Sequence, residues 1–262
     1  MNKPMMAVAA LFFFWALPGS AAAMTVDEIV DRANLASYYA GDDGRSEVRM
    51  TITDAQGRER QRQFVILRHN LEEGGRQMYY VYFQRPADVR RMVFMVHKYL
   101  EQDDDRWLYL PDLDLVRRIA AADKRSSFVG SHFLYEDVSG RTPADDNHEL
   151  VEETDEHYVL EATPLDADLV EFSRYLIWID KEHFLPVKAE YFDRNDDQYR
   201  VVEALEIEDV DGFPTVIQSR VRDLEGGGET VMSFSNVSYN IGLDESLFTE
   251  RYLRRPPREV RR

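Results

Sequence analysis

The sequence predicts a mainly β protein with a few helices, whose antiparallel strands curl into a barrel or half-barrel. Apolar and polar residues alternate with a period of two, as in Val48, Met50 and Ile52, and short runs of this kind are joined by turns rich in Gly and Asp. About eleven or twelve such strands are too many to remain flat in one sheet. The expected strands cover residues 48–53, 63–68, 77–83, 91–99, 106–110, 149–153, 158–163, 174–180, 187–193, 199–208, 215–224 and 229–239.

The N-terminus has the pattern of a secretory signal peptide. Lys3 is followed by the apolar run 5–17, the breakers Pro18-Gly19 and three alanines that end at Ala23. The run is shorter than the ~20 residues that span a bilayer, although an uncleaved anchor is the alternative. We expect residues 1–23 to be removed by cleavage after Ala23 and the rest of the chain to be exported in soluble form.

The remaining chain has the organisation of a single domain, because it contains neither an internal repeat nor a linker. Thr25 can cap a helix over residues 26–40, and the acidic residues that follow it suit a helix N-terminus. A last helical turn is expected over 244–251. The predicted division is therefore a signal peptide (1–23), one domain (24–253) and a basic C-terminal tail (254–262).

Composition excludes several classes of function. The 262 residues include no Cys, which removes disulfides, thiolate catalysis and Cys-ligated metal sites, and the net charge of −17 disfavours nucleic-acid binding. The six His residues are scattered, and no hydrolase, phosphate-binding or dinucleotide motif is present. We expect no enzymatic activity, no cofactor and no metal site. An enzyme that acts on envelope glycan or lipid is the least favoured alternative.

Some expected strands are apolar on both faces. A strand with one face exposed to solvent would instead alternate apolar and polar residues. In residues 77–83, Tyr79, Val81 and Phe83 alternate with Met78, Tyr80 and Tyr82, and residues 91–99 behave in the same way. The second face is therefore covered, either by a helix or by a ligand in an apolar cavity.

The middle of the chain carries a family resemblance. The segments that carry it are Trp107-Leu108-Tyr109-Leu110-Pro111, Arg117-Arg118-Ile119, Phe128-Val129-Gly130-Ser131, Tyr135-Glu136-Asp137, Ile179-Asp180, Leu185-Pro186-Val187 and Leu247-Phe248. With this ordered set the sequence resembles the outer-membrane lipoprotein-sorting family, relatives of the periplasmic carriers LolA and LolB. The resemblance covers essentially the whole mature chain.

The resemblance implies a strongly curved antiparallel half-barrel covered by helices, with an apolar cavity that receives acyl chains in the periplasm. It also implies lipid traffic between envelope membranes, since members of this branch often accompany RND-type exporters of the MMPL kind. The expected partners are the acyl chains of a lipid or lipoprotein and an inner-membrane transporter of that type. A non-enzymatic adaptor that docks on such a transporter without a ligand is the alternative.

Large apolar side chains are the candidates for lining such a cavity, although each of them also fits plain core packing. These candidates are Tyr79, Val81, Phe83, Val93, Met95, Trp107, Tyr109, Phe128, Phe133, Leu134 and Trp178. The segment from Phe128 to Tyr135 is a candidate flap with Gly130 as its hinge, or a turn followed by a short covering helix.

Two groups of basic residues have two interpretations each. Arg117 and Arg118 either contact a lipid headgroup or pair with Glu136 and Asp137. The tail 254–262 contains five Arg, and its Pro256-Pro257 pair favours an extended chain. It is either a solvated tail or an arm that contacts an anionic membrane or an acidic partner.

Overall fold

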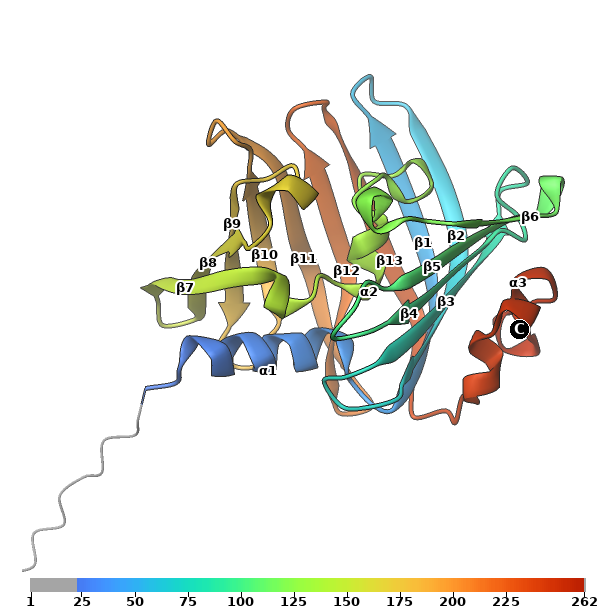
Figure 1. Cartoon of the computed structure of the whole chain (residues 1–262), viewed down its shortest axis with the longest axis horizontal. Helices are drawn as coiled ribbons and strands as arrows, with labels where there is room; N and C mark the ends of the chain where they lie inside the picture. Colours follow the sequence, from blue (N-terminus) through green and yellow to red (C-terminus); the bar gives the residue numbers. More distant parts are fainter. Residues whose placement is uncertain (1–22, 262) are drawn as a thin grey trace, which may run out of the picture.

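The computed structural model describes residues 23–261, and within this range thirteen strands form one antiparallel sheet (Figure 1). Its order is β6-β5-β4-β3-β2-β1-β13-β12-β11-β10-β9-β8-β7, so β6 and β7 are the two free edges. The open, curved sheet with its few helices confirms the predicted mainly β half-barrel. The predicted signal peptide lies almost entirely outside the described residues and stays a prediction.

The first half of the sheet contains β1 (Asp43–Asp54), β2 (Glu59–Asn70), β3 (Gln77–Arg85), β4 (Val93–Lys98), β5 (Asp105–Leu110) and β6 (Leu115–Arg118). The second half contains β7 (Asp146–Glu153), β8 (His157–Pro164), β9 (Arg174–Asp180), β10 (Pro186–Phe192), β11 (Gln198–Val210), β12 (Phe213–Asp223) and β13 (Gly228–Tyr239). The helices are α1 (Val26–Tyr38), α2 (Tyr135–Ser139) and α3 (Glu250–Arg254), with 3-10 turns at Pro111–Leu113, Ala121–Asp123, Phe128–Gly130, Pro143–Asp145, Ala167–Leu169, Glu245–Phe248 and Arg258–Val260.

Each half is a meander of sequential neighbours, and the pairing of β1 with β13 joins the two. This pairing runs from Gly44 opposite Tyr239 to Asp54 opposite Gly228, with one irregularity between Arg45 and Glu47. The sequence analysis found twelve of the thirteen strands. It missed β6, because four residues of the pattern Leu-Val-Arg-Arg show no alternation of apolar and polar positions.

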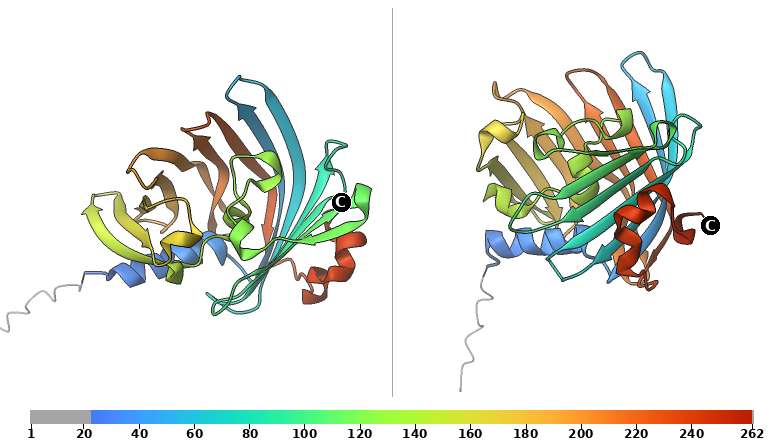
Figure 2. Two further views of the ribbon diagram at one scale, coloured as in Figure 1. Left: turned by 45° about the horizontal axis from the view of Figure 1, so that its top comes forward. Right: turned by 45° about the vertical axis from the view of Figure 1, so that its right-hand side comes forward.

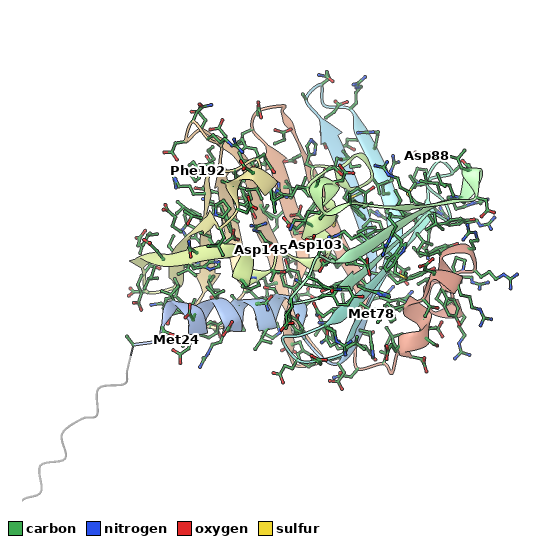
Figure 3. The ribbon with its side chains drawn as sticks, in the orientation of Figure 1. Met24, Met78, Asp88, Asp103, Asp145 and Phe192 are labelled. Atoms are coloured by element: carbon green, nitrogen blue, oxygen red, sulfur yellow. The ribbon has the colours of Figure 1, made fainter. Side chains whose placement is uncertain are left out.

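The segment between the meanders crosses the concave face of the sheet. β6 and β7 follow each other in sequence but form opposite edges, so residues 119–145, which we call the connector, have to span the hollow between them (Figure 2). Asp145, labelled in Figure 3, lies at its far end. Phe128 of the connector is fully buried against Phe64, Phe83 and Phe94 of the first meander.

Helix α1 lies along the lower rim of the second meander (Figure 1). A reciprocal capping box starts it, in which the backbone N–H of Glu28 donates to Thr25 Oγ1 and the backbone N–H of Thr25 donates to the Glu28 carboxylate. Its buried residues Ile29 and Ala33 pack on β8 and β9. The helix ends at Tyr38, two residues before the expected end.

The C-terminal segment covers the convex face of the first meander. Leu243, Phe248, Leu253 and Val260 are buried against apolar side chains of β2 to β5. The tail is therefore anchored to the sheet, and neither a solvated tail nor a free arm describes it. The carbonyls of Glu259 and Val260 accept hydrogen bonds from side chains of β1 and β3. Burial of apolar surface outweighs the solvation of the arginines, which stay at the surface.

We expect Leu253→Ala to lower the free energy of unfolding by about 2–5 kcal/mol, because it opens a void under the C-terminal segment. Leu113→Ala is the matched control, since that side chain is 70% exposed and its loss should change stability by less than about 0.5 kcal/mol. Urea denaturation measures both variants. Equal, small effects of the two substitutions would contradict the anchored segment.

Candidate functional site

A cavity of about 470 Å³ lies in the hollow of the sheet. Its floor is formed by the inward-facing side chains of β1 to β3 and β9 to β13. Its cover is formed by the C-terminal end of α1 and by the connector. Most of the lining is apolar. The principal apolar residues of the floor are Ile66, Ile177, Val202, Val216, Met232 and Phe234.

The connector turns a dense group of charged side chains toward the cavity. The Glu136 carboxylate, 2% exposed, lies 2.5 Å from Arg125 Nη1, 3.1 Å from Lys124 Nζ and 3.4 Å from Arg141 Nη1. Burial alone raises the pKa of a carboxyl group, but the three cations outweigh it and lower the pKa of Glu136 to about 2. Glu136 is therefore an ionised structural anchor of the cover.

Further ion pairs connect this cover to the second meander. Arg125 and Glu171 are 2.7 Å apart, as are Arg141 and Asp146, and Asp137 of α2 pairs with Arg200 of β11 at 2.5 Å. Arg125 also lies over the ring of Phe172, at 4.8 Å from its centroid. The charges that the connector brings toward the cavity are thus neutralised by neighbours and are not free to attract a ligand.

The end of α2 is held from the first meander and from α1. Lys98 Nζ of β4 donates to the carbonyls of Ser139 and Gly140, at 2.8 and 3.1 Å, and burial lowers the pKa of Lys98 to about 8. Gly140 has a φ of +75°, and a Cβ at this position would lie 2.4 Å from the ring of Tyr38. Glycine is therefore required where the connector touches α1.

The structure separates the predicted cavity residues into two faces. Tyr79, Phe128 and Phe133 line the cavity. Val81 and Phe83 lie on the same face of the sheet, packed in the core around Phe128. Both groups belong to the concave side.

Four other candidates lie on the opposite face. Val93, Met95, Trp107 and Tyr109 are buried under the C-terminal segment and do not line the cavity. The apolar second face of β3 to β5 is thus covered by the chain's own C-terminus, one of the two explanations that the sequence left open. The alternation of side chains along a strand shows two faces but does not show which one is concave.

Two further candidates, Trp178 and Leu134, also lie outside the cavity lining. Trp178 alternates with the lining residue Ile177 and stacks with Lys188, whose Nζ is 4.4 Å from the ring centroid. The backbone N–H of Leu134 donates to the Asp137 carboxylate at 2.7 Å, which orders the start of α2.

The segment Phe128–Tyr135 contributes both to the core and to the cover. Gly130 has a φ of +75°, and its carbonyl accepts a hydrogen bond from Arg60. A proline at Gly130 would need a negative φ, so Gly130→Pro would distort the segment and not simply stiffen it. A role of Gly130 as a hinge stays a prediction.

Arg117 and Arg118 are not near Glu136 or Asp137, so the structural pairing expected from the sequence is wrong. Both lie exposed on the edge strand β6, where Arg117 faces Asp123 at 3.7 Å and Arg118 pairs with Asp105. Because β6 pairs with β5 at the edge of the sheet, both arginines are held outside the cavity. Neither arginine lines the cavity.

Sequence analysis missed most of the cavity floor. Val202, Val216, Met232 and Phe234 belong to strands that were expected, and their alternation was visible. They were not singled out because β11 to β13 contain many polar residues and show no run that is apolar on both faces.

An open half-barrel with an apolar cavity in its hollow and helices over it is a LolA-like fold, and comparison with solved structures gives the family. A DUF1329 family protein from Desulfovibrio piger is 32% identical, with 87% of this chain and 96% of that chain covered and a TM-score of 0.78. A family model, described only as that of an uncharacterized protein, matches residues 75–255. The chain belongs to the DUF1329 family.

Two further crystal structures are similar. A domain described as an outer membrane lipoprotein-sorting protein from Vibrio parahaemolyticus is 27% identical, with 87% of this chain and 97% of that chain covered and a TM-score of 0.78. A LolA superfamily protein from Nitrosomonas europaea, 21% identical over 88% of this chain and 100% of that chain at a TM-score of 0.68, shares the fold. No curated protein matches the sequence at a significant level.

No helix among residues 23–261 combines the length and the hydrophobicity needed to cross a membrane.

We expect Glu136→Gln to lower the free energy of unfolding at pH 7 by about 3–5 kcal/mol, because it leaves three buried cations without their shared anion. In the wild type, the unfolded chain, with a carboxyl pKa near 4.5, takes up the proton before the folded protein does. This contribution is therefore complete above pH 4.5 and is lost as the pH falls toward 2.

Urea denaturation between pH 7 and pH 3 measures this effect, with Glu152→Gln on the exposed strand β7 as the control. The stability of the Glu136 variant should fall less steeply with pH than that of the wild type and of the control. Parallel pH profiles for all three proteins would contradict the role assigned to Glu136.

Proposed function

We propose that this protein is a periplasmic carrier that holds the acyl chains of a lipid or lipoprotein in its cavity and moves them between envelope membranes. The observation that carries the proposal is the 470 Å³ apolar cavity between the sheet and its cover. This volume falls in the range of about 300–1,000 Å³ that is typical of ligand sites. The likeness to a lipoprotein-sorting domain supports the same class of function.

The chemistry of the cavity suits an acyl chain. Burial of each CH₂ group contributes about 0.8 kcal/mol and needs no directed chemistry. Met232 and Phe234 on the floor and Phe133 in the cover supply adaptable, polarisable surface for such a chain. The acidic and basic groups at the rim are nearly all paired with each other, so they stabilise the protein and do not form a reactive constellation.

The architecture also suits reversible loading. The floor is one continuous hydrogen-bonded sheet, whereas the cover consists of α1 and the connector, which reach the second meander through side-chain contacts. Movement of the cover would open the cavity without breaking strand pairing. The resemblance supports an RND-type exporter as the exchange partner. It also leaves a ligand-free adaptor as the alternative function, and lipid measurements separate this adaptor from a carrier.

Lipid extracted from the native protein, purified from an envelope fraction, should contain a bound acyl species detectable by mass spectrometry. Protein without any co-purified lipid, together with no binding of an offered lipid, would leave the adaptor as the better description.

We expect Val202→Trp to weaken binding of a neutral fluorescent acyl probe by about tenfold, because the indole fills the floor of the cavity and about 1.4 kcal/mol of chain burial is lost. Leu205→Trp is the matched control on the same strand, since Leu205 is exposed and does not line the cavity. Fluorescence titration measures both variants. Unchanged binding by the Val202 variant would place the probe outside the cavity.

A further inference from the structure

One charged side chain in the cavity lining has no oppositely charged partner. Seven charged residues line the cavity, and six of them have an opposite charge within 4.0 Å. These six are Arg45, Arg125, Glu136, Asp137, Arg141 and Glu203. The seventh, Arg68 of β2, is 9% exposed and forms no ion pair with any residue of the described chain.

The contacts of Arg68 are to neutral groups. Its guanidinium donates to the carbonyls of Tyr38, Ala40 and Gly41 at the end of α1, and it lies 5.9 Å from the ring centroid of Tyr239. The end of a helix dipole offers only about half a negative charge. The carboxylate that acts on the guanidinium, that of Asp43, forms no ion pair with it and instead accepts hydrogen bonds from the backbone N–H groups of Ile241 and Leu243. The guanidinium is thus left without a direct anionic partner at this point of the lining. Burial lowers the pKa of Arg68, yet a guanidinium stays protonated in a protein.

Most of these carbonyls have a second donor. Gln77 Nε2 donates to the Tyr38 carbonyl at 2.7 Å, and Asn70 Nδ2 donates to the Gly41 carbonyl at 2.7 Å. Only the Ala40 carbonyl depends on Arg68 for its hydrogen bond among the described residues. If the guanidinium turns toward a ligand, an anionic group replaces its three carbonyl acceptors, and of these carbonyls only that of Ala40 loses its hydrogen bond.

We propose that Arg68 binds the anionic headgroup, a carboxylate or a phosphate, of an acyl lipid whose chain occupies the cavity. This inference rests on the proposed carrier function and specifies its ligand class. A guanidinium matches both anions through paired hydrogen bonds. The net charge of −17 repels anions from the protein as a whole, so a local cation inside the cavity is what would make an anionic lipid the preferred ligand.

The test compares ligands that share one dodecyl chain. The protein is loaded with N-phenyl-1-naphthylamine, a neutral dye, and the dye is displaced by laurate, by dodecyl phosphate, by dodecanol or by inorganic phosphate. We expect laurate, dodecyl phosphate or both to displace it at about tenfold lower concentration than dodecanol, the ratio that one charge-assisted hydrogen bond gives. The better of the two anions identifies the headgroup, and inorganic phosphate alone should displace nothing.

Arg68→Gln should abolish this preference while dodecanol still displaces the dye. Arg49→Gln, which removes a charge from the neighbouring strand β1 outside the cavity lining, should retain it. If Arg68→Gln does not fold, the ligand series on the wild type still tests the preference for anions, and Arg68→Lys, which keeps the charge but loses the paired guanidinium contacts, should reduce it. Equal displacement by all dodecyl compounds would overturn the headgroup site and leave the carrier standing. Absence of dye and lipid binding altogether would overturn both.

Discussion

The pairing of β1 with β13 is the constraint on which the rest of the structure depends. It joins two meanders that would otherwise be separate sheets, and it places β6 and β7 at opposite edges although they are consecutive in the chain. The connector between them crosses the concave face of the sheet (Figure 2). Because the sheet is curved, this crossing encloses a cavity between the floor and the connector. After β13 the chain continues on the convex side, where the C-terminal segment covers the apolar outer face of β2 to β5.

The two faces of the sheet are stabilised in different ways. On the convex side the C-terminal segment is held mainly by apolar burial, with large side chains such as Phe248 completely enclosed. On the concave side the connector combines one aromatic cluster around Phe128 with a network of ion pairs around Glu136. Desolvation offsets much of the attraction in buried ion pairs, so the network adds less net stability than its short distances suggest, whereas removal of one partner is costly.

This division has a functional consequence under the carrier proposal. The C-terminal segment fills the convex side of the first meander, so the concave hollow is the place where a ligand is accommodated. The cover is held to the second meander by ion pairs and to the first by the aromatic cluster around Phe128, so its outer part can be displaced while the apolar floor stays intact. Arg68 lies between the floor and the end of α1. Among the described residues that line the cavity, it is the charged side chain without an ion-pair partner.

The sequence by itself determined the local elements and the family. Period-two alternation located twelve of the strands, Thr25 with Glu28 located the start of α1, and the motifs of residues 105–140 identified the LolA-like class. Local patterns were sufficient because strand alternation and helix capping depend on residues a few positions apart.

Only the tertiary structure decided which apolar face surrounds the cavity. Tyr79 and Trp107 have equally apolar surroundings in the sequence, yet Tyr79 lines the cavity and Trp107 is buried beneath the C-terminal segment. Their sides are set by the direction in which the sheet curves and by the β1–β13 pairing, which joins residues such as Val48 and Phe234 that are far apart in the chain. Local periodicity does not indicate contacts between residues that are so far apart in the chain. For the same reason, the ion-pair partners of Glu136 and the lack of one for Arg68 could be seen only in the folded structure.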